Sequence, residues 1–132
     1  MKKLIFACIA LLFTLTSFAQ SPVQTMTNDN SAIVNSGTVS STKKLNAPAR
    51  TVTVETVVTK VSGTVGGTVV LQGSLDGTNW HAAGADTLTL ANQTTNKKIW
   101  LLTENRYYHY RTLATGSGTM NATVVSLLLP RQ

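Results

Sequence analysis

The stretch TVTVETVVTKV, residues 51–61, decides the fold class of this chain of 132 residues. Valine alternates with threonine along it almost without interruption. β-Branched residues favour extended backbone, and alternation with a period of two is the pattern of a strand that buries one face. The stretch therefore predicts a long β-strand.

The chain beyond this stretch continues in the same manner. Further alternating or apolar segments predict strands at 69–75, 87–90, 97–103, 106–113 and 120–129. Gly-rich and Asp-Gly turn signals separate these segments, and none of them shows helical periodicity. Short strands spaced by roughly 8–12 residues are typical of an all-β sandwich. We predict an antiparallel β-sandwich, Ig-like or jelly-roll-like, with about six to eight strands.

The segment before Pro48 has a different composition. Residues 20–47 are rich in Ser, Thr, Asn and Gln and contain few large apolar side chains. This composition predicts a polar leader that is either flexible or supplies one edge strand. We therefore expect the sandwich domain to occupy residues 48–132.

Residues 1–19 have the pattern of a signal peptide. Two lysines precede an apolar run at 4–15, and Ser17 and Ala19 are the small residues that a cleavage site requires. The apolar run is shorter than the roughly 20 residues that a membrane-spanning helix needs. We expect a mature chain that begins at Gln20, has no stable membrane span, and is secreted as an extracellular or periplasmic bacterial protein.

Charge and cysteine content narrow the classes of partner. The formal net charge is +6, and the basic residues are spread along the chain in ones and twos. Without a basic cluster or a recognised motif, we do not expect nucleic-acid binding. The single cysteine, Cys8, lies in the expected signal peptide, so the mature chain is expected to have no disulfide.

The segment VVLQGSLDGTNW, residues 69–80, contains a strand, a turn and a tryptophan. Asp76, Gly77 and Asn79 are expected to form a structural turn, because Gly tolerates positive φ and Asp bonds its own backbone. Thr78 adds a further oxygen, but these few donors fall short of the roughly 6–8 oxygens that calcium takes. The turn accounts for the same residues, so we predict no metal site.

This segment, written V-x-L-x-G-S-x-D-G-x-x-W, resembles small β-sandwich modules of phage virions and bacterial surfaces. The resemblance extends over about residues 51–129. It implies a β-sandwich with a structural or binding role and transfers no catalytic residue. The export signal departs from the virion case, which favours a cell-encoded surface or periplasmic protein.

Catalytic patterns are weak in this sequence. Glu55 with Glu104 is the best available carboxylate pair for a glycosidase, yet both belong to segments that are expected to be structural. His81 and His109 have no carboxylate or second histidine at metal-ligand spacing. We therefore predict a protein that is not an enzyme and that needs no cofactor or metal.

The aromatic residues of the mature chain gather in three neighbouring segments, and we divide them by alternation along the strands. The residues expected in the core are Trp80, Trp100, Tyr108 and Tyr110. The residues expected to form an outward binding face are Tyr107, His109 and Arg111.

These observations favour an exported, non-enzymatic structural or interaction module that acts through its surface. It would self-associate, bind a protein partner, or form part of a larger extracellular assembly. The alternative is a carbohydrate-binding module whose Tyr107, His109 and Arg111 contact a glycan. A small hydrolase is a third and less favoured alternative.

Overall fold

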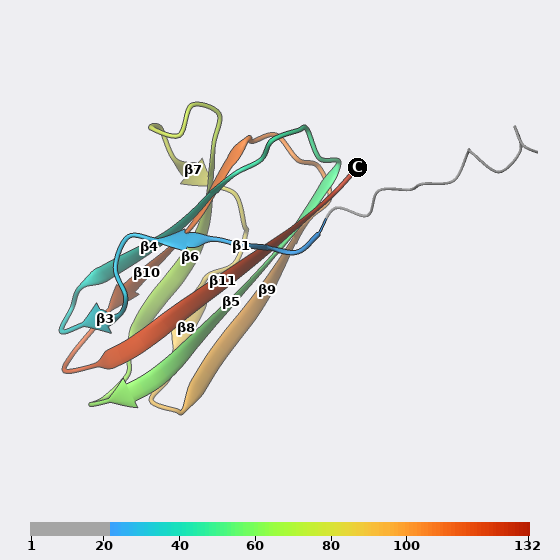
Figure 1. Ribbon diagram of the computed structural model, residues 1–132. Helices are drawn as coiled ribbons and strands as arrows, with labels where there is room; N and C mark the ends of the chain where they lie inside the picture. Colours follow the sequence, from blue (N-terminus) through green and yellow to red (C-terminus); the bar gives the residue numbers. More distant parts are fainter. Residues whose placement is uncertain (1–21) are drawn as a thin grey trace, which may run out of the picture.

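The computed structural model describes residues 22–132, and this part of the chain is a two-layer β-sandwich without helices (Figure 1). All paired strands are antiparallel, which confirms the predicted fold class. Eleven strands are present in the described residues, of which six have seven or more residues. Of the remaining five, the three-residue strand Leu88–Leu90 confirms the segment predicted at 87–90. The other four have two residues each, too few for alternation to be recognised in the sequence. The expected signal peptide lies outside the described residues.

One layer is a five-stranded sheet centred on the Val/Thr-rich stretch at residues 51–61. β5 (Thr51–Ser62) lies between β11 (Asn121–Arg131) and β9 (Thr95–Leu102). The short strands β1 (Gln24–Thr25) and β3 (Ile33–Val34) both pair with the other side of β11. β9 is therefore a long strand at one edge of this sheet.

The other layer is a six-stranded sheet in which β10 lies between β4 and β6, with shorter strands outside them. Its members are β2 (Thr27–Asn28), β4 (Thr38–Lys44), β6 (Gly67–Ser74), β7 (His81–Ala82), β8 (Leu88–Leu90) and β10 (His109–Gly116). β7 and β8 pair with the same side of β6 at its two ends.

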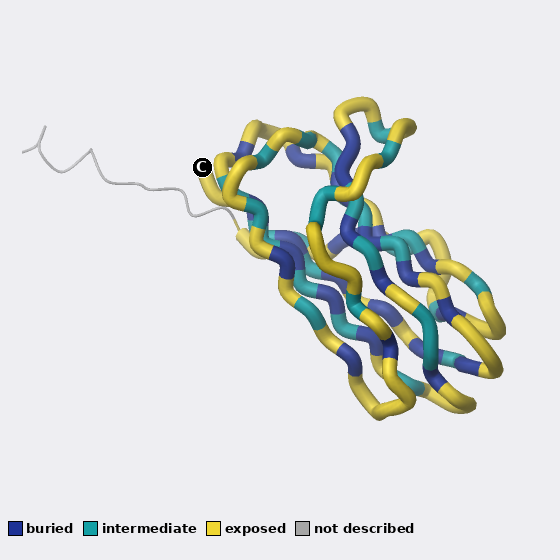
Figure 2. The backbone as a smooth tube through the Cα atoms, turned by 180° about the vertical axis from the view of Figure 1, so that it is seen from behind, coloured by how far each residue is buried: buried dark blue, intermediate teal, exposed yellow. Residues whose placement is uncertain are grey.

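The hydrophobic core fills the space between the two sheets. Buried and more exposed residues alternate along the long strands, as the change of colour in Figure 2 shows. On β5 the side chains of Val52, Val54 and Val58 are fully buried. Full burial of each such side chain contributes about 1.5–3 kcal/mol relative to exposure. The alternation of valine with threonine at 51–61 thus corresponds to one face in the core and one face outside.

A chain of three hydroxyl groups crosses this core. Ser126 Oγ on β11 lies 2.9 Å from Thr56 Oγ1 on β5 and 2.7 Å from Thr112 Oγ1 on β10. All three residues are fully buried. Each hydroxyl has a partner, which avoids the cost of an unpaired buried polar group.

Residues 22–47 differ from the expectation of a flexible leader or a single edge strand. They form four strands that alternate between the two sheets (Figure 1). β1 and β3 pair with β11, whereas β2 pairs with β4, which in turn pairs with β10. Met26, Ile33 and Val39 are buried in the core, at 3%, 0% and 0% exposure. Polar residues dominate this segment because it runs along the side of the sandwich, where only a few side chains point inward.

No helix in the described part of the chain is long and apolar enough to cross a membrane.

Candidate functional site

A tight turn after β6 organises one end of the sandwich. Asp76 Oδ1 accepts hydrogen bonds from the backbone N–H groups of Thr78 and Asn79, each at 2.8 Å, and from Ser74 Oγ at 2.8 Å. Asp76 Oδ2 accepts a bond of 2.7 Å from Asn79 Nδ2. These bonds, first those from the Asn79 and Thr78 backbone, hold the pKa of the Asp76 carboxyl well below its usual range. Gly77 has a φ of 79°, which favours glycine.

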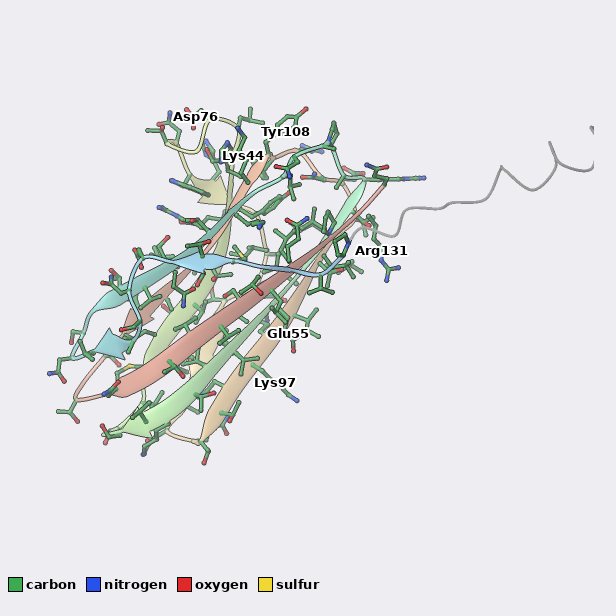
Figure 3. The ribbon with its side chains drawn as sticks, viewed as in Figure 1. Lys44, Glu55, Asp76, Lys97, Tyr108 and Arg131 are labelled. Carbon is green, nitrogen blue, oxygen red and sulfur yellow. The ribbon has the colours of Figure 1, made fainter. Side chains whose placement is uncertain are left out.

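The turn lies close to side chains from two other strands. Figure 3 shows Asp76, Lys44 and Tyr108 at the same end of the sandwich, with Glu55 and Lys97 on the opposite side. A Cβ on Gly77 would lie 3.1 Å from His109 Cε1, so the turn rests against the imidazole of His109. This end of the molecule therefore collects residues that are 30 or more positions apart in the sequence.

Beyond the turn, Trp80 stacks on Arg111 at the outer face of the six-stranded sheet. Arg111 Cζ lies 4.3 Å from the centre of the Trp80 ring, and Arg111 Nε donates a 2.6 Å hydrogen bond to Gln72 Oε1. Arg111 and Gln72 are direct neighbours in the register of β10 and β6. Burial lowers the pKa of the Arg111 guanidinium, which still remains protonated at neutral pH. We call these three residues the Trp80–Arg111 stack.

The other side of the turn opens into a pocket of about 400 Å³, which we call the turn pocket. Its lining residues are Leu75, Asp76, Asn79, His81 and Tyr107. Leu75 is 65% exposed, and Tyr107 supplies an aromatic wall. The pocket thus combines apolar, aromatic and polar groups in one concavity.

The position of Tyr107 depends on a glycine. A Cβ on Gly73 would lie 2.2 Å from Tyr107 Cδ2, so the ring occupies space that any other residue at 73 would fill. Tyr107 also meets Tyr110 edge to face, with ring centres 6.3 Å apart. These contacts fix the ring beside the core while one part of it faces the pocket.

The three residues expected to share a binding face are divided between the two sides of the six-stranded sheet. Tyr107 lies on the inner side, whereas His109 and Arg111 point outward. The alternation predicted for 106–113 does not apply at Tyr107 because β10 begins only at His109. His109 and Arg111 therefore lie on one surface, and Tyr107 belongs to the turn pocket.

The predicted core aromatics also separate into two groups. Trp100 and Tyr110 are buried, at 4% and 0% exposure. Tyr108 is 45% exposed, so its assignment to the core is wrong. Trp80 is half-buried on the outer face of the sheet rather than in the core. Tyr108 precedes β10, so strand alternation does not direct its side chain inward.

Both buried rings are held by polar contacts at their edges. Trp100 Nε1 donates a 2.8 Å hydrogen bond to the carbonyl oxygen of Asp86. Tyr110 OH donates to Asn105 Oδ1. Burial, with a smaller contribution from Tyr107, raises the pKa of Tyr110 to about 12.

The residues weighed for catalysis are not gathered at one place. Glu55 lies within β5, and Glu104 accepts a 3.1 Å bond from Arg106 Nη2 in the loop after β9. His81 pairs with Gly73 and faces the turn pocket, whereas His109 faces outward from β10. Within residues 22–132, no three His, Cys, Asp or Glu side chains are grouped to hold a metal ion.

Two residues of the site were not anticipated. Alternation through the strand predicted at 69–75 would place Leu75 on the same face as Val69 and Leu71, but β6 ends at Ser74 and the turn carries Leu75 outward. Gln72 alternates to the outer face, as its position in a strand implies. Its hydrogen bond to Arg111 depends on the register of β6 and β10. Arg111 lies 39 residues from Gln72 in the chain, so the sequence pattern does not predict this contact.

The outer face of the five-stranded sheet has a different character. Ile99, Leu101 and Val125 are 61%, 65% and 51% exposed there. Glu55 pairs with Ile99 in the register of β5 and β9, and Lys97 lies two residues before Ile99 on β9. An aliphatic surface that includes this acid and this base thus covers the layer.

Comparison with known proteins supports the fold. No protein-family profile matches the sequence, and no curated protein matches it. Among solved structures, the PBSX exported protein XepA matches 83% of this chain with a TM-score of 0.59 and 12% identity. The match spans 37% of that protein.

Two further structures have comparable similarity. The enzymatically active domain of bacteriophage CBA120 tailspike protein 4 matches 87% of this chain and 18% of its own length, with a TM-score of 0.51 and 13% identity. The CBM36-1 domain of a multidomain xylanase, from the hindgut metagenome of Trinervitermes trinervoides, matches 85% of this chain and 98% of its own length, with a TM-score of 0.50 and 11% identity. At these identities the matches establish a shared β-sandwich fold.

Proposed function

We propose that this chain is a non-enzymatic carbohydrate-binding module that is exported and acts in the extracellular or periplasmic space. The turn pocket is its glycan site. The proposal favours carbohydrate binding over a purely structural or interaction role. The single observation that carries it is an open pocket with an aromatic wall and convergent polar groups beside a turn that is rigidly hydrogen-bonded.

The chemistry of the pocket suits a sugar. Small-molecule sites are concavities of about 300–1,000 Å³ in which apolar walls surround a few polar groups. Tyr107 and Leu75 supply the apolar wall, while Asn79 and His81 supply polar atoms that can bond hydroxyl groups. The Asp76 turn holds Asn79 in place. A ligand would therefore meet groups whose positions are already fixed, which lowers the entropic cost of binding.

The same lining argues against hydrolysis. Asp76 is the carboxylate of the turn pocket, and its two oxygens already accept four hydrogen bonds. Glycosidases commonly require two carboxylates on either side of the scissile bond. The pocket is therefore better suited to holding a sugar than to cleaving one.

Fold similarity and the sequence provide secondary support. The xylanase CBM36-1 domain has the same overall fold over 98% of its length, and the name of that domain describes a carbohydrate-binding module. The signal-peptide pattern at residues 1–19 supports export, as does the resemblance of residues 69–80 to surface modules. N-terminal sequencing of exported material, with Gln20 as the expected first residue, tests this part.

The experiment is a calorimetric titration with neutral oligosaccharides of different linkage, preceded by a glycan-array screen. We expect Leu75→Ala and His81→Ala to weaken binding of the glycan selected by the array. Leu101→Ala is the matched control, because Leu75 and Leu101 are each 65% exposed but lie at different sites. Equal binding by wild type and both pocket variants, or no glycan bound at all, would contradict the proposal.

A second candidate function, self-association, has support from a different surface. The aliphatic outer face of the five-stranded sheet leaves Ile99 and Leu101 largely exposed. Glu55 and Lys97 are diagonal neighbours on this face. Consider a dimer whose twofold axis lies in the interface plane and passes midway between these two residues. Glu55 of one copy would then lie over Lys97 of the second copy, and Lys97 over Glu55, as an isologous contact requires.

Analytical ultracentrifugation tests this second candidate. The sedimentation coefficient of the wild type should rise with concentration, and that of Leu101→Lys should not. Leu75→Lys should behave as the wild type. Glu55→Lys should weaken association, and the exchange of both charges in Glu55→Lys with Lys97→Glu should restore it. A wild type that remains monomeric up to about millimolar concentration contradicts the candidate.

A further inference from the structure

The Trp80–Arg111 stack holds a cation in one orientation at the molecular surface. The indole covers one side of the guanidinium at 4.3 Å, and Gln72 Oε1 accepts the hydrogen bond from Nε at 2.6 Å. An arginine side chain normally loses rotational freedom about several bonds when it binds a ligand, which costs entropy. Here stacking and the Gln72 bond have already restricted those bonds in the free protein.

This cation has no anionic partner in the described chain. The ion pairs of residues 22–132 join Lys98 to Asp86 and Arg106 to Glu104. Arg111 Nη1 and Nη2 donate no hydrogen bond to any residue of this range, since its one such bond is made by Nε. Two strong donors of a partly buried guanidinium are thus left for an external acceptor.

The surroundings of Arg111 are also cationic or neutral. The strands of the six-stranded sheet contain no Asp or Glu within the described chain. On its outer face, Thr42 lies beside Arg111, and Lys44 lies beside His109 in the next row. The neighbouring turn contains Asp76, but both of its oxygens are occupied within the turn. Asp29, which directly follows β2, lies beside Ser40 at the far edge of this sheet and accepts a 2.8 Å hydrogen bond from Ser40 N. Neither carboxylate forms an ion pair with the guanidinium in the described chain.

A planar guanidinium matches a carboxylate or a sulfate group, because its paired N–H groups can donate to two oxygens at once. A neutral sugar offers single hydroxyl groups and would leave part of this capacity unused. The nearby hydroxyl of Thr42 and the ammonium of Lys44 can add bonds to the same anion or to the sugar ring that bears it.

We propose that the Trp80–Arg111 stack is an anion subsite that selects acidic glycans, in which a sugar carries a carboxylate or sulfate group. This inference rests on the proposed function, since it names the class of glycan that this module prefers. The turn pocket binds the sugar chain, and the stack binds the charged substituent on the other side of the same turn. Selection arises because only an acidic unit pairs with both free donors of Arg111.

The experiment compares three oligosaccharides of equal length at about 0.15 M salt, where long-range attraction between exposed charges is screened. The probes are an oligogalacturonide, a sulfated heparin oligosaccharide and a neutral xylo-oligosaccharide. Wild-type protein should bind at least one acidic probe about tenfold or more tightly than the neutral one, as expected for hydrogen bonds to a charged group. The two acidic arms distinguish a carboxylate from a sulfate.

Arg111→Gln should abolish this preference, and Arg131→Gln should retain it. Both variants change the net charge equally, but Arg131 is an exposed residue at the end of β11, on the other sheet. Arg111→Lys keeps the charge and loses the planar fork, so it should recover only part of the preference. Circular dichroism and melting midpoints verify folding, and Trp80→Phe provides a second test of the stack if Arg111→Gln does not fold.

The outcomes separate the inference from the proposed function. Binding of neutral and acidic probes with equal affinity overturns the anion subsite and leaves the turn pocket intact. A preference that Arg131→Gln weakens as much as Arg111→Gln also overturns it, since general charge attraction then accounts for the result. Failure of every probe to bind overturns both proposals.

Discussion

The two tryptophans, Trp80 and Trp100, were both expected in the core, but the structure gives them opposite settings. Trp100 is 4% exposed, packs beneath the loop before β8, and donates its indole N–H to the carbonyl of Asp86. A Cβ on Gly84 would lie 2.6 Å from Trp100 Cδ1, so this loop is closely fitted to the ring. Trp80 is half-buried outside the other sheet, with Arg111 over its ring.

The two rings differ in the groups that surround them. Trp100 is enclosed by the protein and its N–H is bonded to Asp86, so its burial contributes to stability and it has little surface that a ligand could contact. Trp80 is paired with a cation whose terminal donors have no partner in the described residues. The inner ring therefore supports the fold, and the outer ring positions a group that can bind. The following predictions test this division, beginning with the largest expected effect.

Trp100→Ala should cost about 3–5 kcal/mol of the free energy of unfolding, as large buried aromatics do on truncation. Urea denaturation followed by far-UV circular dichroism measures this. Trp100→Phe is the control: it keeps part of the packing but loses the hydrogen bond to Asp86, so its cost should be smaller. If Trp100→Ala unfolds at the wild-type midpoint, the inner ring does not support the fold and the comparison fails.

Tyr110→Phe should cost about 0.5–1.5 kcal/mol at neutral pH, because the phenolic hydrogen bond to Asn105 Oδ1 is lost while that oxygen still accepts from Tyr107 N. The effect should change with alkaline pH. The folded-state pKa of Tyr110 is raised to about 12, above its ordinary value of about 10. The stability that depends on the neutral phenol is therefore complete below pH of about 10 and is lost as the pH rises toward about 12.

Denaturation midpoints of wild type and Tyr110→Phe, measured from neutral to alkaline pH, test this sign. The difference between the two proteins should shrink above pH of about 10, because the variant has no phenol to ionise at this position. A difference that stays constant would show that Tyr110 is not the buried, bonded ring described above.

Much of this fold can be predicted where the signal is local. The alternation of valine and threonine at 51–61 predicts β5, because each side chain reports its own face of a strand. The same argument fails for Tyr107 and Tyr108, which precede β10 and follow a different backbone path. Alternation identifies a strand but does not identify the residue at which the strand begins.

Contacts between distant segments were the least predictable. Asn28 Nδ2 donates to the carbonyl oxygen of Val124, 96 positions away. That kind of contact turns residues 22–47 from an expected leader into part of both sheets. The Trp80–Arg111 stack likewise depends on the register of β6 and β10. Composition and spacing carry no information on which distant strands pair, so they cannot locate either feature.

Trp80→Ala should cost only about 0.5–1 kcal/mol, the usual range for a cation–π contact at an exposed site. The loss is small because the ring lies outside the core and its removal leaves no enclosed cavity. The same variant should lose the preference for acidic oligosaccharides, since Arg111 is then free to move. A cost comparable to that of Trp100→Ala would show that both rings are structural and would remove the distinction between them.

The smallest effect is expected at the turn that carries Trp80. The folded-state pKa of Asp76 lies below its unfolded value, so ionised Asp76 contributes stability above pH of about 4, and this contribution is lost as the pH falls below that value. Asp76→Asn keeps an oxygen acceptor for the Thr78 and Asn79 backbone but removes the charge. Because Asp76→Asn lacks the ionised carboxylate, it should be less stable than the wild type at neutral pH and approach it as Asp76 becomes protonated in acid. Its stability should therefore fall less steeply in acid than that of the wild type.

Thermal melts between neutral pH and about pH 2 measure this difference, and Asn79→Ala provides the matched variant. Asn79→Ala removes the side-chain bond to Asp76 Oδ2 and retains the two backbone donors, which are the larger causes of the lowered pKa. Its acid dependence should consequently lie between those of the wild type and Asp76→Asn. If Asp76→Asn follows the wild type throughout the acid range, the charge of Asp76 does not hold the turn. The position of Trp80 over Arg111 must then be maintained by the stack itself.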